Sequence, residues 1–187
     1  QLSGGMRQRV GIAAALARDP SILIADEPTT ALDVTTQREV LTLVRDIQQR
    51  RGMTFLIITH DLRVAFSMAD QVLVLYAGRT MESGPSEQIL TAQLHPYTQA
   101  LLAAEPPANR RLVTIPAIPG SVPRHDDVVA QCAFADRCHW VRPQCRAGQP
   151  EPVLVQPGHT SACMRVGEIA GQLRNTDQAA TAIESTT

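Results

Sequence analysis

The first half of the chain carries apolar residues at a helical spacing in two segments. In residues 5–18 and 35–51 they recur every three or four positions, which predicts two amphipathic helices. Pro20 stops the first helix, and Gly52 suits the C-terminal cap of the second. Asp61 can cap a third, shorter helix.

Short unbroken apolar runs lie between these helices. Runs of this kind predict strands that are buried on both faces. They occupy residues 22–25, 54–59 and 71–76, and residues 79–82 form the hairpin partner of the last run. Strands that alternate with helices indicate βαβ units, so we expect an α/β fold with a mostly parallel sheet.

The alternating pattern stops near residue 84, and a different composition follows. Two short helices are expected in residues 86–105, broken at His95-Pro96. Ten of the 13 prolines lie at or after residue 96, and all four cysteines lie between 132 and 163. We therefore expect three parts: an α/β part at 1–84, a small loop-rich unit at 85–167, and a polar, disordered tail at 168–187.

Charge and composition exclude several classes of protein. The formal net charge of the 187 residues is −1, whereas a nucleic-acid binder usually carries a basic stripe. No apolar run approaches the roughly 18 residues that span a bilayer, and no signal peptide is recognisable. These features predict a cytosolic protein that could still dock on a membrane protein.

The chain contains no lysine, because all 17 basic residues are arginine. A phosphate loop of the form G-x-x-x-x-G-K-[ST] needs that lysine to reach the β- and γ-phosphates. The first residue is Gln1 and not methionine. We therefore expect the chain to begin inside a longer domain whose phosphate loop lies upstream.

Ser3, Gly4 and Gly5 stand where the first helix is expected to begin. The free N–H groups and the dipole of a helix N-terminus favour a phosphate, and glycines let the backbone approach it closely. Taken alone, the same residues are also typical of a glycine-rich turn.

Two further polar positions follow predicted strands. Asp26 and Glu27 end the first strand, and His60 follows the second. Ligands of open α/β sheets bind beyond the carboxyl ends of the strands. One acid there can hold Mg²⁺, and its neighbour can deprotonate an attacking water. Alone, each feature also fits an acidic turn or a structural histidine.

The order of these motifs resembles the ABC ATPase family. The segment QLSGGMRQRV resembles the signature motif, ILIADEP the Walker B motif, TTALDV the D-loop and ITHDL the switch-histidine loop. The resemblance implies the C-terminal part of a P-loop NTPase nucleotide-binding domain. One departure is Met6, which stands where the family usually has glutamine and lacks an amide to donate or accept hydrogen bonds.

The resemblance also implies a role for each motif. Ser3, Gly4 and Gly5 would contact the γ-phosphate of ATP that a second nucleotide-binding domain holds. Asp26 would help to coordinate Mg²⁺, and Glu27 would be the general base. Asp33 of the D-loop would couple the two halves, and His60 would contact the γ-phosphate.

Residues beyond 61 narrow the resemblance to the ATP-binding subunits of dipeptide and oligopeptide importers. The evidence is MADQVLVLYAGRTMESGP followed by HPYTQALLAAEP. This resemblance implies peptides or similar small solutes as cargo. It implies transmembrane permease subunits, a homodimeric or heterodimeric partner and, indirectly, a peptide-binding protein. The location it implies is peripheral, on the cytoplasmic face of the membrane.

The four cysteines fall within 32 residues of the loop-rich unit, at Cys132, Cys138, Cys145 and Cys163. Disulfides are unusual in the cytosol, and the spacings lack the C-x₂₋₄-C of common zinc sites. The importer extensions that this segment resembles can carry a [4Fe–4S] cluster on such cysteines. We expect a cluster ahead of zinc, and four free thiols remain an alternative.

Two other interpretations compete with an importer subunit. A truncated or degenerate remnant would act at most as an interaction module, and its strands would leave apolar surface uncovered. A DNA-repair ABC ATPase would usually carry coiled-coil or zinc insertions, and the chain has no heptad run.

Overall fold

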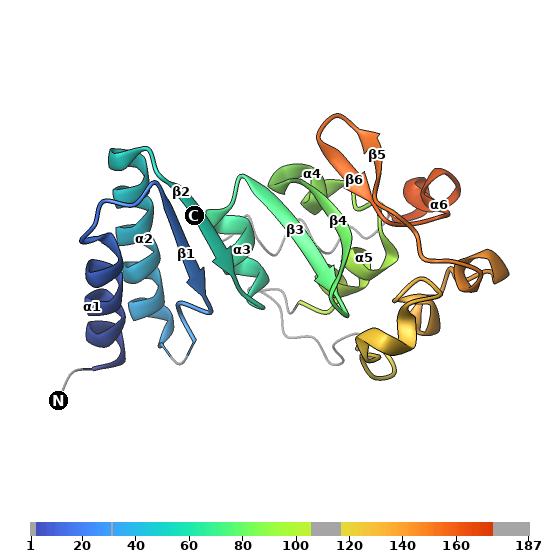
Figure 1. The fold of residues 1–187 in the computed structure, drawn as a ribbon, viewed down its shortest axis with the longest axis horizontal. Helices are drawn as coiled ribbons and strands as arrows, with labels where there is room; N and C mark the ends of the chain where they lie inside the picture. The colour runs from blue at the N-terminus through green and yellow to red at the C-terminus, as the bar shows by residue number, and fades with distance from the viewer. Residues whose placement is uncertain (1–2, 31, 106–116, 174–187) are drawn as a thin grey trace. The chain divides into compact units, whose positions relative to one another are not determined.

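The computed structural model describes residues 3–30, 32–105 and 117–173, and the chain divides into two compact units, 1–69 and 70–187 (Figure 1). None of the helices in these described ranges is long and apolar enough to cross a membrane.

The first unit alternates helices with two strands, as its apolar pattern predicts. Its elements are α1 (Gly4–Leu16), β1 (Ile22–Asp26), α2 (Val34–Arg51), β2 (Thr54–Ile58) and α3 (Leu62–Met68). β1 and β2 pair in parallel, in a register that runs from Ile22 opposite Thr54 to Asp26 opposite Ile58. The two strands therefore end at the same edge of the sheet.

Side-chain caps fix where the helices of this unit begin. Ser3 accepts a hydrogen bond from the amide of Met6, and Asp61 accepts bonds from the first turn of α3. Gly52 ends α2 with a φ of 62°, a left-handed conformation that suits glycine. The cap that Gly52 was predicted to form is confirmed.

The core of the first unit lies between the two longest helices and one face of the sheet. α1 and α2 lie side by side (Figure 1). Leu16 of α1, Val44 of α2 and Leu23 of β1 are buried together with Met53. Ile12, Ile47 and Phe55 pack against this cluster.

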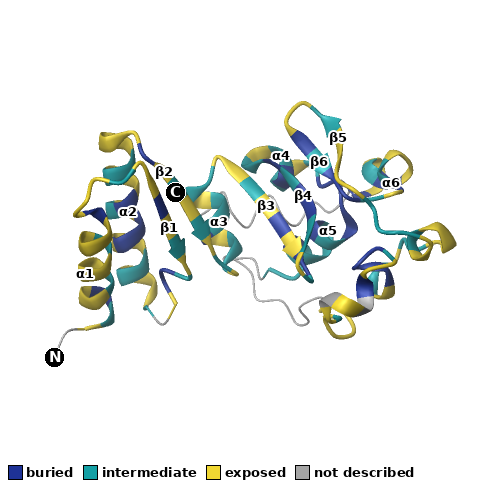
Figure 2. Cartoon of the chain, viewed as in Figure 1, coloured by how far each residue is buried: buried dark blue, intermediate teal, exposed yellow. Residues whose placement is uncertain are grey.

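The opposite face of the same sheet is open to solvent, so the prediction that both strands are buried on two faces is wrong for these residues. Exposed residues alternate with more buried ones along both strands (Figure 2). Their exposed fractions are 58% for Ile22, 63% for Ile24, 50% for Leu56 and 49% for Ile58. In the part of unit 1 that the structure describes, only one face of this sheet is covered by helices.

The second unit is built on an antiparallel sheet. Its strands are β3 (Gln71–Tyr76), β4 (Arg79–Pro85), β5 (Val153–Gln156) and β6 (His159–Ser161), in the order β3-β4-β6-β5. Its α-helices are α4 (Ser86–Thr91), α5 (Pro96–Ala103) and α6 (Val166–Leu173). Single 3₁₀ turns lie at His125–Val128, Ala135–Arg137 and Pro143–Arg146.

The structure thus confirms the α/β class, but it corrects the prediction that the strands pair mostly in parallel. Only β1 and β2 pair in parallel among the described strands. In the second unit β3 and β4, and likewise β5 and β6, are each joined by a tight turn, which reverses the chain and forces antiparallel pairing. β6 also pairs antiparallel with β4, which lies far away in sequence.

The C-terminal segment contains structure that the sequence analysis does not predict. The hairpin of β5 and β6 turns at Pro157-Gly158, where Gly158 has a φ of 72°. A Pro-Gly pair just after the apolar run 153–155 is the signal that could have found it. The tail that was expected to be disordered from 168 is helical up to Leu173 in α6, and residues 174–187 lie outside the described residues.

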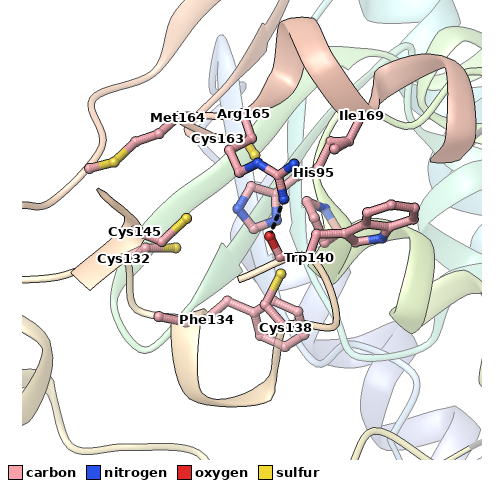
Figure 3. Close-up of a pocket in the computed structure, with 12 residues that line it drawn as sticks. His95, Cys132, Phe134, Cys138, Trp140, Cys145, Cys163, Met164, Arg165 and Ile169 are labelled. Carbon is pink, nitrogen blue, oxygen red and sulfur yellow. Dashed lines mark hydrogen bonds between the residues drawn. The ribbon is translucent and has the colours of Figure 1, made fainter. Parts of the chain in front are cut away.

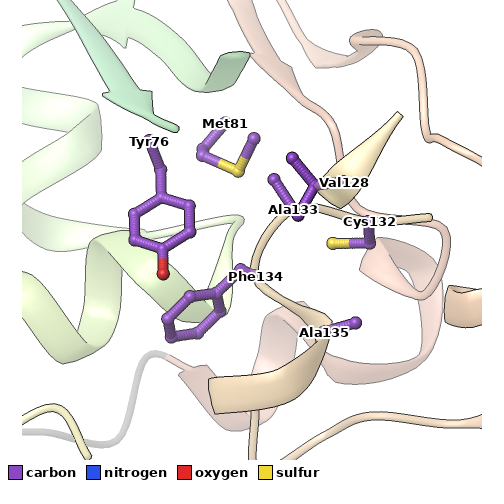
Figure 4. Packing of buried hydrophobic residues seen from close by; sticks show 7 residues of the cluster. All are labelled: Tyr76, Met81, Val128, Cys132, Ala133, Phe134 and Ala135. Atoms are coloured by element: carbon purple, nitrogen blue, oxygen red, sulfur yellow. The ribbon is translucent and has the colours of Figure 1, made fainter. Parts of the chain in front are cut away.

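The core of the second unit gathers around Phe134 (Figure 4). The Phe134 ring packs against Tyr76 and Tyr97, with centroids 5.4 and 5.2 Å away. The cluster comprises Tyr76, Met81, Val128, Cys132, Ala133, Phe134 and Ala135. It joins the β3–β4 hairpin to the loop-rich segment that carries three of the cysteines.

A buried carboxylate organises the His95-Pro96-Tyr97-Thr98 segment. Glu82 of β4 accepts hydrogen bonds from the amides of Leu94 and His95 at 2.9 and 3.0 Å. Its Oε1 also lies 2.7 Å from Nε2 of His159, and both side chains are fully buried. This one acid therefore connects β4, the start of α5 and β6.

Candidate functional site

The strongest candidate site lies at the carboxyl edge of the β1–β2 sheet. Asp26 is the last residue of β1, and its partner Ile58 is the last residue of β2. Because the strands are parallel, Glu27 and His60 follow at the same edge, as predicted. His60 Nδ1 lies 2.7 Å from Glu27 Oε1, so the structure brings these two side chains together.

The backbone of Glu27 is held in an unusual conformation. Its φ is 47°, in the left-handed region that non-glycine residues seldom adopt. The amide of Glu27 donates to the carbonyl of Ile58 at 2.8 Å, and the carbonyl of Glu27 accepts from the amide of Thr30 at 3.2 Å. These two bonds fix the residue beyond the end of the strand, a position at which strained residues often mark function.

The carboxylate of Glu27 accepts hydrogen bonds at both oxygens. Oε1 accepts from the backbone amide of His60 at 3.1 Å, in addition to its contact with Nδ1. Oε2 accepts from the hydroxyl of Thr30 at 2.9 Å. The carboxylate of Glu27 is therefore held by two loops, the one that follows β1 and the one that follows β2.

These contacts shift both pKa values in the direction expected for an ion pair. The hydrogen bond with His60, and then that from Thr30, lowers the pKa of Glu27. The same bond and the negative charge of Glu27 raise the pKa of His60. The pair is accessible, with 36% of the Glu27 side chain and 81% of the His60 side chain exposed, so water screens it.

Asp26 lies beside this pair in sequence and lines a pocket between β1 and the two long helices. The same pocket is lined by Gln8 of α1 and by Pro28. A carboxylate at a strand end next to an ionised glutamate is an oxygen donor of the kind that Mg²⁺ accepts. Asp26 therefore offers one carboxylate donor for the expected magnesium, and no group of three or more His, Cys, Asp or Glu residues in the described part of the chain is arranged around it to hold an ion.

The signature residues pack against the beginning of α2. A Cβ atom added at Gly5 would lie 2.4 Å from Cγ2 of Thr36, and one at Gly4 would lie 3.3 Å from Cδ2 of Leu32. Only glycine fits at position 5 without displacing Thr36. This contact explains the second glycine by helix packing, independently of any ligand.

Asp33, which was expected in the D-loop, is the N-cap of α2. Its Oδ1 accepts from the amide of Thr36 at 2.9 Å, and its Oδ2 accepts from the Thr36 hydroxyl at 2.6 Å. These bonds lower the pKa of Asp33. Asp33 and Gly5 thus share one neighbour, Thr36, and the signature and D-loop motifs meet there.

The four cysteines line one largely apolar pocket in the second unit (Figure 3). Cys132 and Cys145 lie next to one another, and the amide of Cys132 donates to the carbonyl of Cys145 at 2.9 Å. Arg165 closes another side through a hydrogen bond to the carbonyl of Trp140. The prediction that the cysteines gather at one place agrees with this arrangement.

The four thiols are not arranged as a metal site in the part of the chain that the structure describes. No group of three or more His, Cys, Asp or Glu residues within the described ranges is arranged to hold an ion. All four are free thiols. Burial raises the pKa of Cys138 to about 11 and that of Cys163 to about 12, so both are protonated at neutral pH. The donor types suit a cluster, but their present placement does not support one.

Two threonines contribute to the site and were missed in the sequence analysis. Thr30 bonds to the carboxylate of Glu27, and Thr36 bonds to Asp33 while packing on Gly5. Both follow an acid by three residues, a spacing at which hydroxyls commonly cap turns and helices. That spacing is the signal that could have found them.

Comparison with family models finds two matches. Residues 81–145 match the family described as "Oligopeptide/dipeptide transporter, C-terminal region". Residues 1–30 match the family described as "ABC transporter".

Individual relatives agree with these matches. A probable peptide ABC transporter ATP-binding protein of Sinorhizobium fredii is 45% identical over 170 residues, which cover 90% of this chain and 51% of the relative. A protein of Brucella abortus, named for ATP binding in peptide import, is 44% identical over 164 residues, which cover 87% of this chain and 49% of the relative.

The chain thus spans about half the length of these relatives. A solved ATP-binding cassette, dimeric and bound to ADP and Pi after hydrolysis, is 38% identical over 46% of this chain and 37% of that chain, with a TM-score of 0.42. From these comparisons we conclude that residues 81–145 match the C-terminal region family of oligopeptide/dipeptide transporters, that residues 1–30 match the ABC transporter family, and that the chain is similar to ATP-binding proteins of peptide ABC transporters.

Proposed function

We propose that these residues belong to the ATP-hydrolysing, energy-coupling subunit of an ABC importer for peptides or similar small solutes. The observation that carries the proposal is the contact of Glu27 with His60 at the sheet edge directly after Asp26. Two side chains with the chemistry of phosphoryl transfer meet there, directly after a third in sequence, Asp26, in a chain whose relatives bear the name of peptide transport.

In this proposal Glu27 is the general base. Its lowered pKa keeps the carboxylate ionised at neutral pH, so it can accept a proton from a water that attacks a phosphoryl group. His60 contacts the γ-phosphate through its exposed ring, and its raised pKa favours the cationic form beside that anion. Asp26 would hold Mg²⁺, which neutralises charge on the phosphates.

The remaining motif residues would act across a dimer. Ser3, Gly4 and Gly5 would contact ATP held by a second nucleotide-binding domain, and Asp33 would couple the two domains. Further proposed partners are transmembrane permease subunits and, indirectly, a peptide-binding protein. The proposed location is the cytoplasmic face of the membrane, where the subunit is peripheral.

An upstream phosphate loop is required, because the 187 residues contain no lysine. The test compares two proteins: the chain alone, and the chain fused behind the part of the Sinorhizobium fredii protein that precedes the segment similar to this chain. We expect magnesium-dependent ATP hydrolysis only from the fusion. Hydrolysis by the chain alone, abolished in Glu27→Gln, would show that it needs no such loop. A correctly folded fusion that stays inactive would count against the function.

The exposed apolar face of the β1–β2 sheet favours a second candidate. A remnant that lacks the rest of its domain would leave these side chains in water and would act at most as an interaction module. If the chain alone is insoluble and becomes soluble in the fusion, the result supports an importer subunit. If the chain alone is soluble and folds cooperatively, and the fusion does not improve its solubility, the result supports an interaction module.

For the cysteines, we propose a [4Fe–4S] cluster, with zinc as the less favoured metal. The support is that four thiols from separate segments line a single pocket; the thiols would have to move closer and lose their protons. Anaerobic purification followed by visible absorption and metal analysis tests this. We expect iron and sulfide that disappear in Cys138→Ser and persist in the control His139→Ala. Metal-free protein after anaerobic iron–sulfur reconstitution would contradict the proposal.

A further inference from the structure

Thr30 contacts Glu27 through both its backbone and its side chain. The amide of Thr30 donates to the carbonyl of Glu27 at 3.2 Å, and its hydroxyl donates to Oε2 of Glu27 at 2.9 Å. The two residues thus close a small turn just beyond β1. Thr30 itself is exposed, so this turn is not a consequence of burying the threonine.

The Thr30 hydroxyl acts on the carboxylate oxygen that His60 leaves free. His60 approaches Oε1 with its amide at 3.1 Å and with Nδ1 at 2.7 Å. Each carboxylate oxygen therefore has its own partner, and the plane of the carboxylate is defined from two sides. Both partners are needed to define that plane, so the loss of the Thr30 bond leaves the carboxylate free to turn about its contacts with His60.

The neighbouring threonine does not share this geometry. Thr29 is buried, whereas the exposed Thr30 directs its hydroxyl back to Glu27.

We propose that Thr30 is a positioning residue for the reaction, which holds Oε2 of Glu27 so that Oε1 stays directed toward His60 and the attacking water. This inference rests on the proposed function, because it assigns Thr30 to the same reaction. Serine would preserve the hydroxyl donor. Valine has nearly the shape of threonine and removes the donor.

The test follows the backbone amide of His60 by NMR in the 187-residue chain, because that amide donates to Glu27 Oε1. In Thr30→Val we expect the amide proton to exchange about threefold faster or more, the factor that loss of a modest hydrogen bond implies. We also expect its chemical shift to move toward the value in Glu27→Gln. Thr30→Ser should restore both readings, and Thr91→Val, which removes a hydroxyl far along the chain, is the control.

Two results would overturn the inference. One is a Thr30→Val spectrum in which the His60 amide is indistinguishable from wild type. The other is a Thr30→Ser variant that behaves like Thr30→Val, since the threonine methyl and not the hydroxyl would then matter. These readings need no ATP turnover. They can fail while the fusion still hydrolyses ATP through Glu27, and they can succeed while the fusion is inactive, so the two proposals are tested separately.

Discussion

At Glu27 the backbone and the side chain are fixed by different neighbours. The backbone bond to Ile58 and the left-handed φ set the direction of the side chain, and His60 and Thr30 then define the carboxylate. The sequence allowed Asp26, Glu27 and His60 to be placed at one edge, because strand ends can be recognised from apolar runs. It did not reveal Thr30, because the partner of a hydroxyl depends on a turn that no apolar pattern encodes.

The coupling of His60 to Glu27 predicts a titration that can be measured. The pKa of His60 should lie above its usual range, and Glu27→Gln should bring it down because the negative charge is lost. The charged pair exists only between the lowered pKa of Glu27 and the raised pKa of His60, and it disappears outside that window. Imidazole proton shifts followed against pH give the value. An unchanged pKa of His60 in Glu27→Gln would show that the two side chains are not paired.

The pKa of the buried His95 is shifted downward, in the opposite direction to that of His60. This shift predicts that the protein loses stability in acid. Burial lowers the pKa of His95 to about 3, whereas an unfolded histidine titrates near 6.5. The unfolded chain therefore binds a proton that the folded chain excludes, and stability falls as pH drops below about 6.5. At pH 5 this histidine should lower the free energy of unfolding by about 2 kcal/mol relative to pH 7.5.

Urea unfolding at the two pH values checks this contribution. His95→Gln should show a smaller loss of stability between pH 7.5 and pH 5, although it will be less stable at both. His139→Gln, which changes an exposed histidine, should lose as much as wild type. If all three proteins lost the same free energy of unfolding between pH 7.5 and pH 5, the result would contradict a buried, neutral His95.

At the scale of elements, the helices of the first unit followed from spacing and caps, whereas the C-terminal hairpin and α6 were missed. β5 and β6 are four and three residues long, and they gain their order by pairing with each other and by the pairing of β6 with β4. Strands this short have little periodicity of their own. The cysteines were correctly grouped because they are close in sequence, but spacing alone could not show that their thiols are not arranged around a metal.

The contact between α1 and α2 predicts a contrast between two glycines of one helix. Gly5→Ala would press a methyl group onto Thr36 and should destabilise the protein by about 1–3 kcal/mol, the range for overpacking. Gly11→Ala meets no atom within 4 Å and should stabilise α1 by about 0.5–1 kcal/mol, because alanine is the better helix former. Chemical denaturation measures both. If the two substitutions changed the free energy of unfolding equally, α1 would not pack on the start of α2 in solution.

At the scale of the whole molecule, the open face of the β1–β2 sheet dominates the behaviour expected of the chain. Ile24 on that face is 63% exposed, whereas Leu23 on the other face belongs to the core. Ile24→Glu should therefore increase soluble yield with little change in stability. Leu23→Ala should lose about 2–5 kcal/mol, as expected for a buried leucine.

Expression yield and thermal unfolding of these two variants distinguish the faces. If Ile24→Glu unfolds the chain as severely as Leu23→Ala, both faces are covered in solution, and the arrangement of this sheet would need revision. In the fusion, by contrast, we expect Ile24→Glu to be destabilising, because parallel sheets are normally covered on both faces.

The central claim is that Glu27 is the base that drives ATP hydrolysis once a phosphate loop is supplied. The most direct measurement is kcat of the fusion with and without Glu27→Gln, beside the control Glu39→Gln, which alters an exposed acid on α2. We predict that Glu27→Gln lowers kcat by about 10²-fold or more while ATP still binds, and that the control leaves kcat unchanged. Wild-type turnover in the Glu27→Gln fusion would contradict the assignment.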